Sequence, residues 1–572
     1  MVNKKTKNQK ILITAALPYI NNVPHLGHIA GSHLPADIFA RYCRSKGYET
    51  LFVGGTDESG SPSEIAAEEI GISLDVFSKK LYEIHAEIYK WFNISYDNFS
   101  RTSKSIHHKT TQEFFKAIYD NKYIKEGVMN VFYSPTEKRF LSDRYVRGQC
   151  PKCGFEGASG DQCEKCTSVH DPTELKNPKS SITGNAVEIR SAKHLFLRLD
   201  QLEPKLKKWI AKQKSWRTQV RSIAQGWIKE GLHERSITRD LKNGVSVPLK
   251  GYEDKVLYVW FDAPIGYVSS TKELLPNGWK SFWKGKDVQI FHFLGKDNIP
   301  FHTIFWPATI MASGGIVNLP NHVAGYQYLN YEGGKFSKSK KRGIFCEKLP
   351  ETGIDSDIIR AYITFVLPET SDSEFKWEDF KNRINADLIG NFGNFINRTL
   401  KFVNGKLGGE VIKPNENEFT KNDKELMKKV NTGVQKITDY LEAAEIKKAF
   451  SEAFALSAQG NKYFDDCKPW VLVREDEEKT KKILYNCVNL CRTLAIIFSP
   501  FVPNAAKNVW KQIGLKGNVD DPKNWDTAKD YEIPKKHKIG NPEALFKRLD
   551  DDYLDNFKEI TANAPDLKQL FK

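Results

Sequence analysis

Four cysteines in the first third of the sequence have the spacing of metal ligands. They form two Cys-x-x-Cys pairs, Cys150 with Cys153 and Cys163 with Cys166, and nine residues separate the pairs. Two tight turns of this kind can direct four thiolates at one tetrahedral Zn²⁺, and a site closed by four thiolates leaves no position for water. Four unliganded thiols or two disulfides are the alternative interpretation. The spacing favours one structural zinc ion.

A loop near the N-terminus contains histidines that could act on phosphate. The segment His25-Leu26-Gly27-His28 follows an apolar run and opens a helical pattern. A helix N-terminus offers free N–H groups and a positive dipole to a phosphate, and Gly27 lets a ligand approach the backbone closely. His25 and His28 could stabilise charge that develops on phosphate oxygens during displacement at phosphorus. Two surface histidines on a loop are the alternative interpretation.

A glycine-flanked basic loop is the second segment that could bind phosphate. It has the sequence GGKFSKSKKRG and contains Lys335, Ser337, Lys338 and Ser339. Its ammonium and hydroxyl groups suit a triphosphate, although a basic loop on its own is usually a solvated turn. The sequence contains no G-x-x-x-x-G-K-[ST], which disfavours a P-loop ATPase.

An open parallel sheet with an insertion would position these loops. Residues 10–60 predict a strand, a loop, a helix and a second strand, which is a βαβ unit. The apolar runs YVWFDAPIGY (258–267) and VQIFHFLGKD (288–297) predict two more strands that end at the same edge. Residues 119–250 break this rhythm and contain the clustered cysteines. We interpret them as a small inserted domain.

The last third of the sequence has a helical pattern. From about Asp387 the period changes, and a capping-type segment at Asn422–Glu425 precedes apolar residues at Leu426, Val430 and Val434. A helical bundle is therefore predicted. The polar residues from about 531 onward carry isolated apolar side chains, which we expect to dock back onto the body.

Composition and charge limit the class of protein. The 572 residues are 40% hydrophobic, 12% aromatic and 27% charged, which predicts a folded multidomain chain and excludes global disorder. The net charge of +15 favours a polyanionic partner, with nucleic acid ahead of a membrane surface. No apolar run approaches the ~20 residues that a membrane span needs. Cysteine usage indicates a reducing compartment, so we expect a soluble cytoplasmic protein and interpret the N-terminal apolar run as a buried strand rather than a secretory signal.

Together these motifs point to one family. HLGH followed by KFSKS is the pair of signatures of class I aminoacyl-tRNA synthetases. The sequence resembles the methionyl-tRNA synthetases through ALPYINNVPHLGH, GGTDESG, YVWFDAPIGY, FLGKDNIPFHTIFWPA and GGKFSKS, with the Cys₄ knuckles and the Lys-Pro-Trp ending at Trp470. The resemblance spans most of the chain and implies an AMP-forming ligase. It would activate L-methionine with Mg²⁺-bound ATP to methionyl-adenylate and pyrophosphate, then transfer methionine to the 3′-terminal adenosine of initiator and elongator tRNA(Met).

The resemblance also implies a division of the chain. The expected fold is α/β, a Rossmann-like parallel-sheet catalytic domain with an inserted zinc-knuckle domain, followed by an all-α anticodon-binding bundle. The expected segments are 1–118 and 251–325 for the two halves of the catalytic domain, 119–250 for the insertion, 326–386 for the KFSKS loop and stem-contact region, 387–530 for the anticodon-binding domain and 531–572 for the C-terminal segment. We expect one Zn²⁺ and a monomer.

Site residues follow from the resemblance, position by position. The methionine pocket would comprise Leu17, Tyr19, Asp57, Trp260, Ala263, Pro264, Tyr267 and His302, with Asp57 on the substrate ammonium group. The ATP site would comprise Pro18, His25, Gly27, His28, Gly295, Lys296, Asp297, Lys335, Ser337, Lys338 and Ser339, of which His25, His28, Lys335 and Lys338 would be catalytic. Asn394, Arg398, Pro469 and Trp470 would read the CAU anticodon, and Cys150, Cys153, Cys163 and Cys166 would bind the zinc. Core packing of the aromatic residues, and a solvated helix face for the Asn/Arg pair, are the alternatives without the resemblance.

Two positions depart from the family pattern, and two alternative functions remain open. Phe336 stands where the family commonly has Met, and Ala324 stands where relatives often have His. Another class I synthetase, of cysteinyl or leucyl type, would share both signatures, but an insertion of about 130 residues is too small for the hydrolytic domain of a branched-chain editing enzyme. A noncatalytic zinc-containing RNA-binding protein would have no reason to keep both phosphate-facing motifs.

Overall fold

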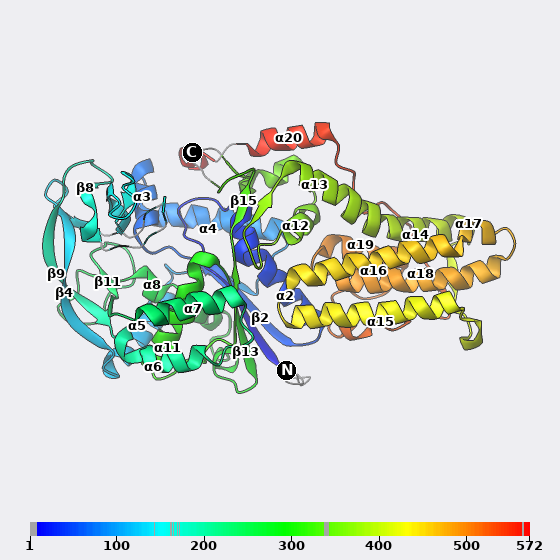
Figure 1. Ribbon diagram of the computed structural model, residues 1–572, viewed down its shortest axis with the longest axis horizontal. Helices are drawn as coiled ribbons and strands as arrows, with labels where there is room; N and C mark the ends of the chain where they lie inside the picture. Colours follow the sequence, from blue (N-terminus) through cyan, green and yellow to red (C-terminus); the bar gives the residue numbers. More distant parts are fainter. Residues whose placement is uncertain are drawn as a thin grey trace.

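The computed structural model describes residues 9–141, 143–160, 163, 165–166, 168, 170, 172–336, 342–562 and 565–571. The parallel sheet lies in the middle of the elongated molecule, between a bundle of long helices at one end and an insertion at the other (Figure 1).

The central sheet is parallel throughout and has the order β14-β13-β1-β2-β3. Its strands are β1 (Lys10–Ala15), β2 (Glu49–Thr56), β3 (Asn98–Arg101), β13 (Val288–Gly295) and β14 (His322–Tyr326). Side chains of β1 alternate between two cores: Ile11 and Ile13 pack with α2 (Leu34–Ser45), and Leu12 packs with α9 (Ile265–Leu274). Both faces are therefore covered, which explains the continuous apolar runs in the sequence.

The strand order creates a switch point in the sheet. The chain runs outward from β1 through β2 to β3, and it later returns to the opposite side of β1 as β13 and β14. In open parallel sheets, ligands bind at the carboxyl ends of the strands beside such a reversal. The HLGH segment follows β1 and the GKD segment at residues 295–297 begins at the end of β13, so both lie on the carboxyl side of the sheet.

The predicted strand at residues 258–267 is wrong. This segment forms the short helix α8 (Val259–Asp262) and the start of α9. Pro264 is the N-cap residue of α9, where its missing N–H costs no hydrogen bond. An apolar run that is buried all round does not distinguish a strand from a helix by periodicity. The strand predicted at 288–297 is confirmed as β13.

In its described residues, the insertion contains two small antiparallel sheets and the α-helices α6 (Leu199–Ile210) and α7 (Thr218–Glu230). One sheet has the order β10-β9-β4-β5. It is dominated by the long pair β4 (Ile124–Ser134) and β9 (Glu188–Leu197), and β5 (Arg139–Leu141) and β10 (Arg235–Ser236) form its edges. The other sheet has the order β7-β6-β8 and lies beside the cysteine cluster; its strands are β6 (Val146–Gln149), β7 (Ala158–Ser159) and β8 (Lys176–Ser180). Helices α6 and α7 lead back to the central sheet. Figure 1 shows this unit at the end of the molecule opposite the helical bundle.

The helical bundle in the last third of the chain consists of helices whose apolar faces are buried in one shared core. Its members are α14 (Asn394–Lys406), α15 (Lys421–Glu442), α16 (Ile446–Cys467), α18 (Glu477–Phe498) and α19 (Pro503–Ile513). Helix α15 begins earlier than the predicted cap, because Thr420 accepts a hydrogen bond from the backbone of Asp423 and the Asp423 carboxylate accepts one from the backbone of Thr420.

Other helices connect these units. They are α3 (Ser61–Ile70), α4 (Leu74–Trp91), α5 (Ser105–Asp120), α12 (Ser356–Phe365), α13 (Trp377–Arg383) and α20 (Asp551–Thr561). The C-terminal segment lies against the body: Phe557 is fully buried, and Lys381 pairs with Asp551 at 2.6 Å.

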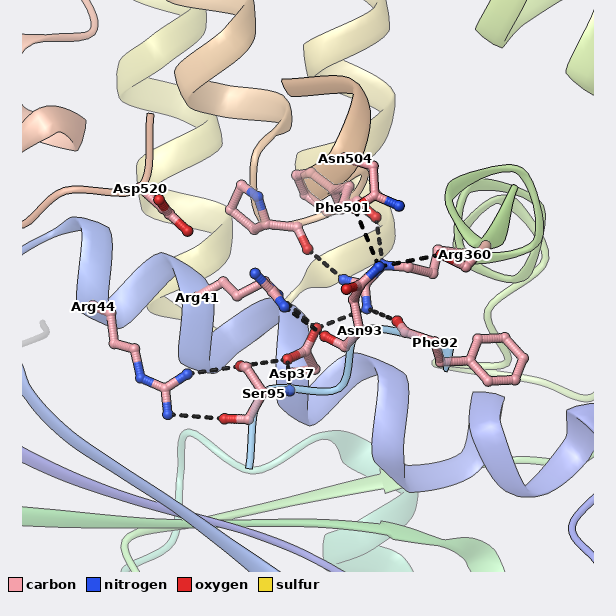
Figure 2. A network of polar contacts seen from close by, with 12 residues as sticks. Asp37, Arg41, Arg44, Phe92, Asn93, Ser95, Arg360, Phe501, Asn504 and Asp520 are labelled. Atoms are coloured by element: carbon pink, nitrogen blue, oxygen red, sulfur yellow. Dashed lines mark hydrogen bonds and ion pairs between the residues drawn. The ribbon is translucent and has the colours of Figure 1, made fainter. Parts of the chain in front are cut away.

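A buried ionic network joins the sheet to the bundle (Figure 2). The guanidinium of Arg360 on α12 pairs with Asp37 on α2 at 2.8 Å, and both side chains are fully buried. It also donates to the main-chain carbonyls of Phe92, Pro500 and Phe501, at 2.8, 2.8 and 2.9 Å. The Arg360 side chain thus links helix α2, the loop before β3 and the turn between α18 and α19.

Candidate active site

The two signature histidines lie at the start of the helical segment that continues into α2. His25 is the N-cap residue of α1 (Leu26–His28), and its Nδ1 accepts a hydrogen bond from the backbone of Gly27 at 3.1 Å. The backbone N–H of His25 donates in turn to Nδ1 of His28, also at 3.1 Å. Both Nδ1 atoms are acceptors, so each neutral imidazole carries its proton on Nε2. This arrangement makes both Nε2–H groups donors, as a phosphate oxygen requires.

Gly27 is needed for the position of His25. A Cβ atom at residue 27 would lie 2.8 Å from Cε1 and 2.9 Å from Nδ1 of the His25 ring. Real Cβ contacts are longer, so any side chain here would displace the imidazole.

The described ends of the basic loop contact the histidine loop. The rings of Phe336 and His25 stack with centroids 4.5 Å apart and planes 5° apart. On the other flank, the backbone of Leu26 donates to Ile344 and that of Cys346 donates to Pro24. The histidine segment and the described ends of the basic loop, about three hundred residues apart in the sequence, therefore meet at the carboxyl edge of the sheet. Ser337, Lys338 and Ser339 lie outside the described residues.

Lys335 and the GKD segment come together around one aromatic ring. The ammonium groups of Lys335 and Lys296 lie 5.0 and 5.5 Å from the ring centroid of Tyr328, and the Tyr328 hydroxyl donates to Asp297. Gly31, one turn after His28, faces Gly295 with a hypothetical Cβ 3.9 Å from its Cα. Among the residues predicted to bind ATP, those that the structure describes therefore lie at one part of the sheet edge, and the Pro18 carbonyl accepts a hydrogen bond from the backbone N–H of Asp57 beside them.

The predicted methionine pocket brings together several of its members. The Tyr267 hydroxyl donates to Nε2 of His302 at 2.9 Å, and Nδ1 of His302 donates to the Asn298 carbonyl at 3.0 Å. Burial lowers the pKa of His302 to about 4, so the ring is neutral at ordinary pH. This pair presents neutral polar atoms among apolar walls, which suits an uncharged thioether.

Other pocket residues line the same region. A Cβ atom on Gly266 would lie 3.0 Å from Leu17, so Leu17 packs directly on the helix of Tyr267. Trp260 contacts Phe301, the neighbour of His302, with ring centroids 4.5 Å apart. Ala263 and Pro264 follow Trp260 in the turn between α8 and α9.

Asp57 follows β2 and its backbone pairs with that of Tyr19. The residue is 3% exposed, and the pKa of its carboxyl group is raised well above the usual value. Burial is the first cause and the charges of Asp262 and Glu58 add to it, while a hydrogen bond from the backbone N–H of Ser59 opposes the rise of the pKa. A buried carboxylate with too little compensating charge favours a bound cation. A substrate ammonium group would supply that charge.

Several residues of this region carried no recognisable signal in the sequence. Asp262, buried beside His107 with Nε2 to Oδ2 at 3.6 Å, sits inside the YVWFDAPIGY motif but was not distinguished from its neighbours. Arg239, whose guanidinium lies 3.6 Å from the centroid of the Tyr258 ring, and Tyr328 were also missed. Their positions depend on contacts between distant segments.

Ala324, which stands where relatives often have His, is fully buried in the core.

The four clustered cysteines converge. Their Sγ atoms all lie within 4.8 Å of one another, with Cys150 to Cys166 at 3.8 Å and Cys153 to Cys163 at 3.6 Å. Tetrahedral Zn²⁺ with Zn–S bonds of about 2.3 Å places sulfur atoms about 3.8 Å apart, so these spacings fit a metal ion. All nine cysteines of the chain are free thiols, which rules out the two disulfides.

The predicted anticodon residues lie at one end of the bundle. Arg398 stacks on Phe464 at 4.2 Å and pairs with Asp465 at 2.6 Å, while the indole of Trp470 lies on the same Phe464 with centroids 6.2 Å apart. Trp470 is 44% exposed, and Pro469 before it is buried. Asn394, one turn before Arg398, donates to Asn461.

Comparison with known proteins agrees with this geometry. Residues 11–400 match the family described as tRNA synthetases class I (M), and residues 413–565 match the anticodon binding domain of methionyl tRNA ligase. Methionine–tRNA ligase 1 of Acaryochloris marina is 42% identical over 96% of this chain and 99% of its own length. The chain belongs to the methionyl-tRNA synthetase family. As a methionyl-tRNA synthetase it is a class I ligase that joins methionine to transfer RNA.

Further relatives support the assignment of this methionyl-tRNA synthetase. The cytoplasmic methionine–tRNA ligase of Arabidopsis thaliana is 39% identical and aligns with 97% of this chain and 72% of its own. The structure of Mycobacterium tuberculosis methionyl-tRNA synthetase in complex with methionyl-adenylate superposes with a TM-score of 0.79 at 25% identity, covering 94% of this chain and all of that one. Across the described residues, no helix combines the length and the apolar character that crossing a membrane requires.

Proposed function

We propose that this synthetase forms methionyl-adenylate at the edge where His25 meets Phe336. The stacking of these two rings carries the proposal, because it brings the histidine segment and the start of the basic loop together. His25 and His28, with protons on Nε2, would stabilise charge on the α-phosphate as the methionine carboxylate attacks it. Lys335 and Lys338 would hold the departing pyrophosphate. Pro18, Gly27, Gly295, Lys296, Asp297, Ser337 and Ser339 would complete the ATP site.

Methionine would occupy the slot next to this edge. Asp57 would bind its ammonium group, and the neutral Tyr267 and His302 pair would face its sulfur. Leu17, Tyr19, Trp260, Ala263 and Pro264 would supply the apolar walls. The raised pKa of Asp57 supports this role, because a bound ammonium group would hold that carboxylate ionised.

The helical end of the molecule would read the anticodon. Arg398 and Trp470 share contacts with Phe464, so a base stacked on the exposed indole would lie beside the guanidinium. Asn394 and Pro469 would complete a CAU site for initiator and elongator tRNA(Met). In this division, the anticodon would be bound by residues 387–530, and catalysis would be performed by residues 1–118 together with residues 251–325.

The metal would be bound within residues 119–250. The basic loop and the stem contacts would belong to residues 326–386, and the segment that lies against the body would comprise residues 531–572.

The cofactors would be Zn²⁺ and Mg²⁺. Cys150, Cys153, Cys163 and Cys166 fit a structural zinc ion by their sulfur spacing and their donor type. Magnesium would enter with ATP.

We further propose that the protein is a cytoplasmic monomer, in keeping with relatives that are named cytoplasmic. Sedimentation velocity would test the monomer.

Amino-acid-dependent ATP–pyrophosphate exchange tests the proposed chemistry. Wild-type protein should exchange with methionine and with no other amino acid among the twenty. Lys338→Ala should reduce exchange strongly with an unchanged unfolding temperature, whereas Lys229→Ala on α7 should leave it unchanged. Exchange with a different amino acid would refute the pocket, and undiminished exchange in Lys338→Ala would refute the assigned role of the basic loop.

A further inference from the structure

An aromatic residue beside the basic loop has no assigned role and contacts three charged groups. Tyr328, two residues after β14, is half-buried. The Nζ atoms of Lys296 and Lys335 lie 5.5 and 5.0 Å from the centroid of its ring, and its hydroxyl donates to Asp297 Oδ1. A single side chain therefore links the GKD segment after β13 to the first lysine of the basic loop.

The backbone of Tyr328 is fixed on both sides. Its N–H donates to Asp372 Oδ1 at 2.9 Å, and its carbonyl accepts from Ser373 at 2.9 Å. The preceding Gln327 donates to Pro368 at 2.8 Å. The ring consequently stands on a rigid support, while the two lysine side chains that it contacts are long and flexible.

Electrostatics explains why a ring is useful here. Two ammonium groups near one point repel each other, and lysine side chains lose considerable rotamer entropy when they are ordered. The negative face of an aromatic ring attracts cations within about 6 Å. The phenol stays neutral, because burial and the neighbouring Asp297 carboxylate raise the pKa of Tyr328. Tyr328 can thus hold both ammonium groups without cancelling their charge.

We propose that Tyr328 is a positioning residue that holds Lys296 and Lys335 together before ATP arrives, so that the triphosphate meets two placed cations. The inference rests on the proposed function, because both lysines belong to the proposed ATP site. Part of the entropy cost of ordering the lysines is then met in the free enzyme, which strengthens ATP binding.

Steady-state ATP–pyrophosphate exchange on purified full-length protein tests the proposal. With methionine saturating and ATP varied, Tyr328→Leu should lower kcat/KM for ATP about 5- to 30-fold, which corresponds to about 1 to 2 kcal/mol. The KM for methionine should not change. Tyr328→Phe keeps the ring and should stay within about 2-fold of wild type. If Tyr328→Leu does not fold, Tyr328→Met carries the same expectation with a more adaptable side chain.

Controls separate positioning from general damage. Tyr123→Leu removes a different tyrosine, which lies in the inserted segment with its ring 5.4 Å from Lys205 Nζ, and should leave exchange unchanged. In a Lys296→Met background, Tyr328→Leu should cost less than in wild type. Unchanged kcat/KM in Tyr328→Leu, or equal losses in the Phe and Leu variants, would overturn the inference. Absence of methionine-dependent exchange in wild type would instead refute the proposed function.

Discussion

Replacing Arg360 by methionine should destabilise the protein more than any exposed charge substitution. The guanidinium makes four interactions, one with the Asp37 carboxylate and three with the main-chain carbonyls of Phe92, Pro500 and Phe501. Methionine has a similar length, so the change removes these bonds and leaves a small cavity. Asp37 keeps Arg41 and Ser95 as partners, yet three carbonyls lose their donor in a region sealed from water.

The magnitude follows from burial. Removing one partner of a buried pair costs about 3–5 kcal/mol, since the other groups stay buried without compensation. The matched control is Arg383→Met, whose pair with Asp379 has side chains 44% and 38% exposed. An exposed pair contributes about 0–1 kcal/mol. The two variants therefore differ by several kcal/mol although each loses one Arg–Asp pair.

Urea unfolding followed by tryptophan fluorescence measures the difference. The Arg360→Met transition should move to clearly lower urea, whereas the Arg383→Met transition should stay close to wild type. The chain has several domains, so midpoints of each resolved transition are compared rather than one free energy. Equal midpoints for the two variants would refute the conclusion that this network joins the sheet to the bundle.

Three further predictions concern the histidine loop, the metal cluster and a buried acid. Gly27→Ala should lower exchange on the order of 10- to 100-fold because the new Cβ displaces His25. Gly226→Ala should leave exchange unchanged, because beyond its own stretch of helix its Cβ would meet no atom within 4 Å. Equal activities of the two variants would contradict the geometry. Cys150→Ser should lose bound zinc in a metal assay, and Cys491→Ser should retain it; zinc retained in both would remove Cys150 from the site. Burial raises the pKa of Asp357 to about 7 from 3.8, so the folded state binds this proton more tightly and stability should fall as pH rises from about 4 to 7, by at most about 1.4 kcal/mol per pH unit. Unfolding midpoints at several pH values should show a weaker slope in Asp357→Asn, and an unchanged slope would contradict the assignment.

Local patterns in the sequence predicted much of the fold. The βαβ unit at residues 10–60 was recognisable because a buried strand, a glycine-containing loop and an amphipathic helix each have a short-range signature. The convergence of the four cysteines also followed from spacing, since two short knuckles restrict where their thiols can point. The failed strand at 258–267 shows the limit of this reasoning. Its residues are buried on all sides, so hydrophobicity carried no period.

The sequence by itself determined which residue types this protein has for binding phosphate, metal and nucleic acid, because those motifs are contiguous. Only the tertiary structure decided how they combine. Phe336 reaches His25, Tyr328 reaches Lys296 and Lys335, and Arg360 reaches the turn at Phe501 through contacts between distant segments. Such contacts depend on strand order and helix packing, which bring remote residues together without leaving any regular spacing in the chain.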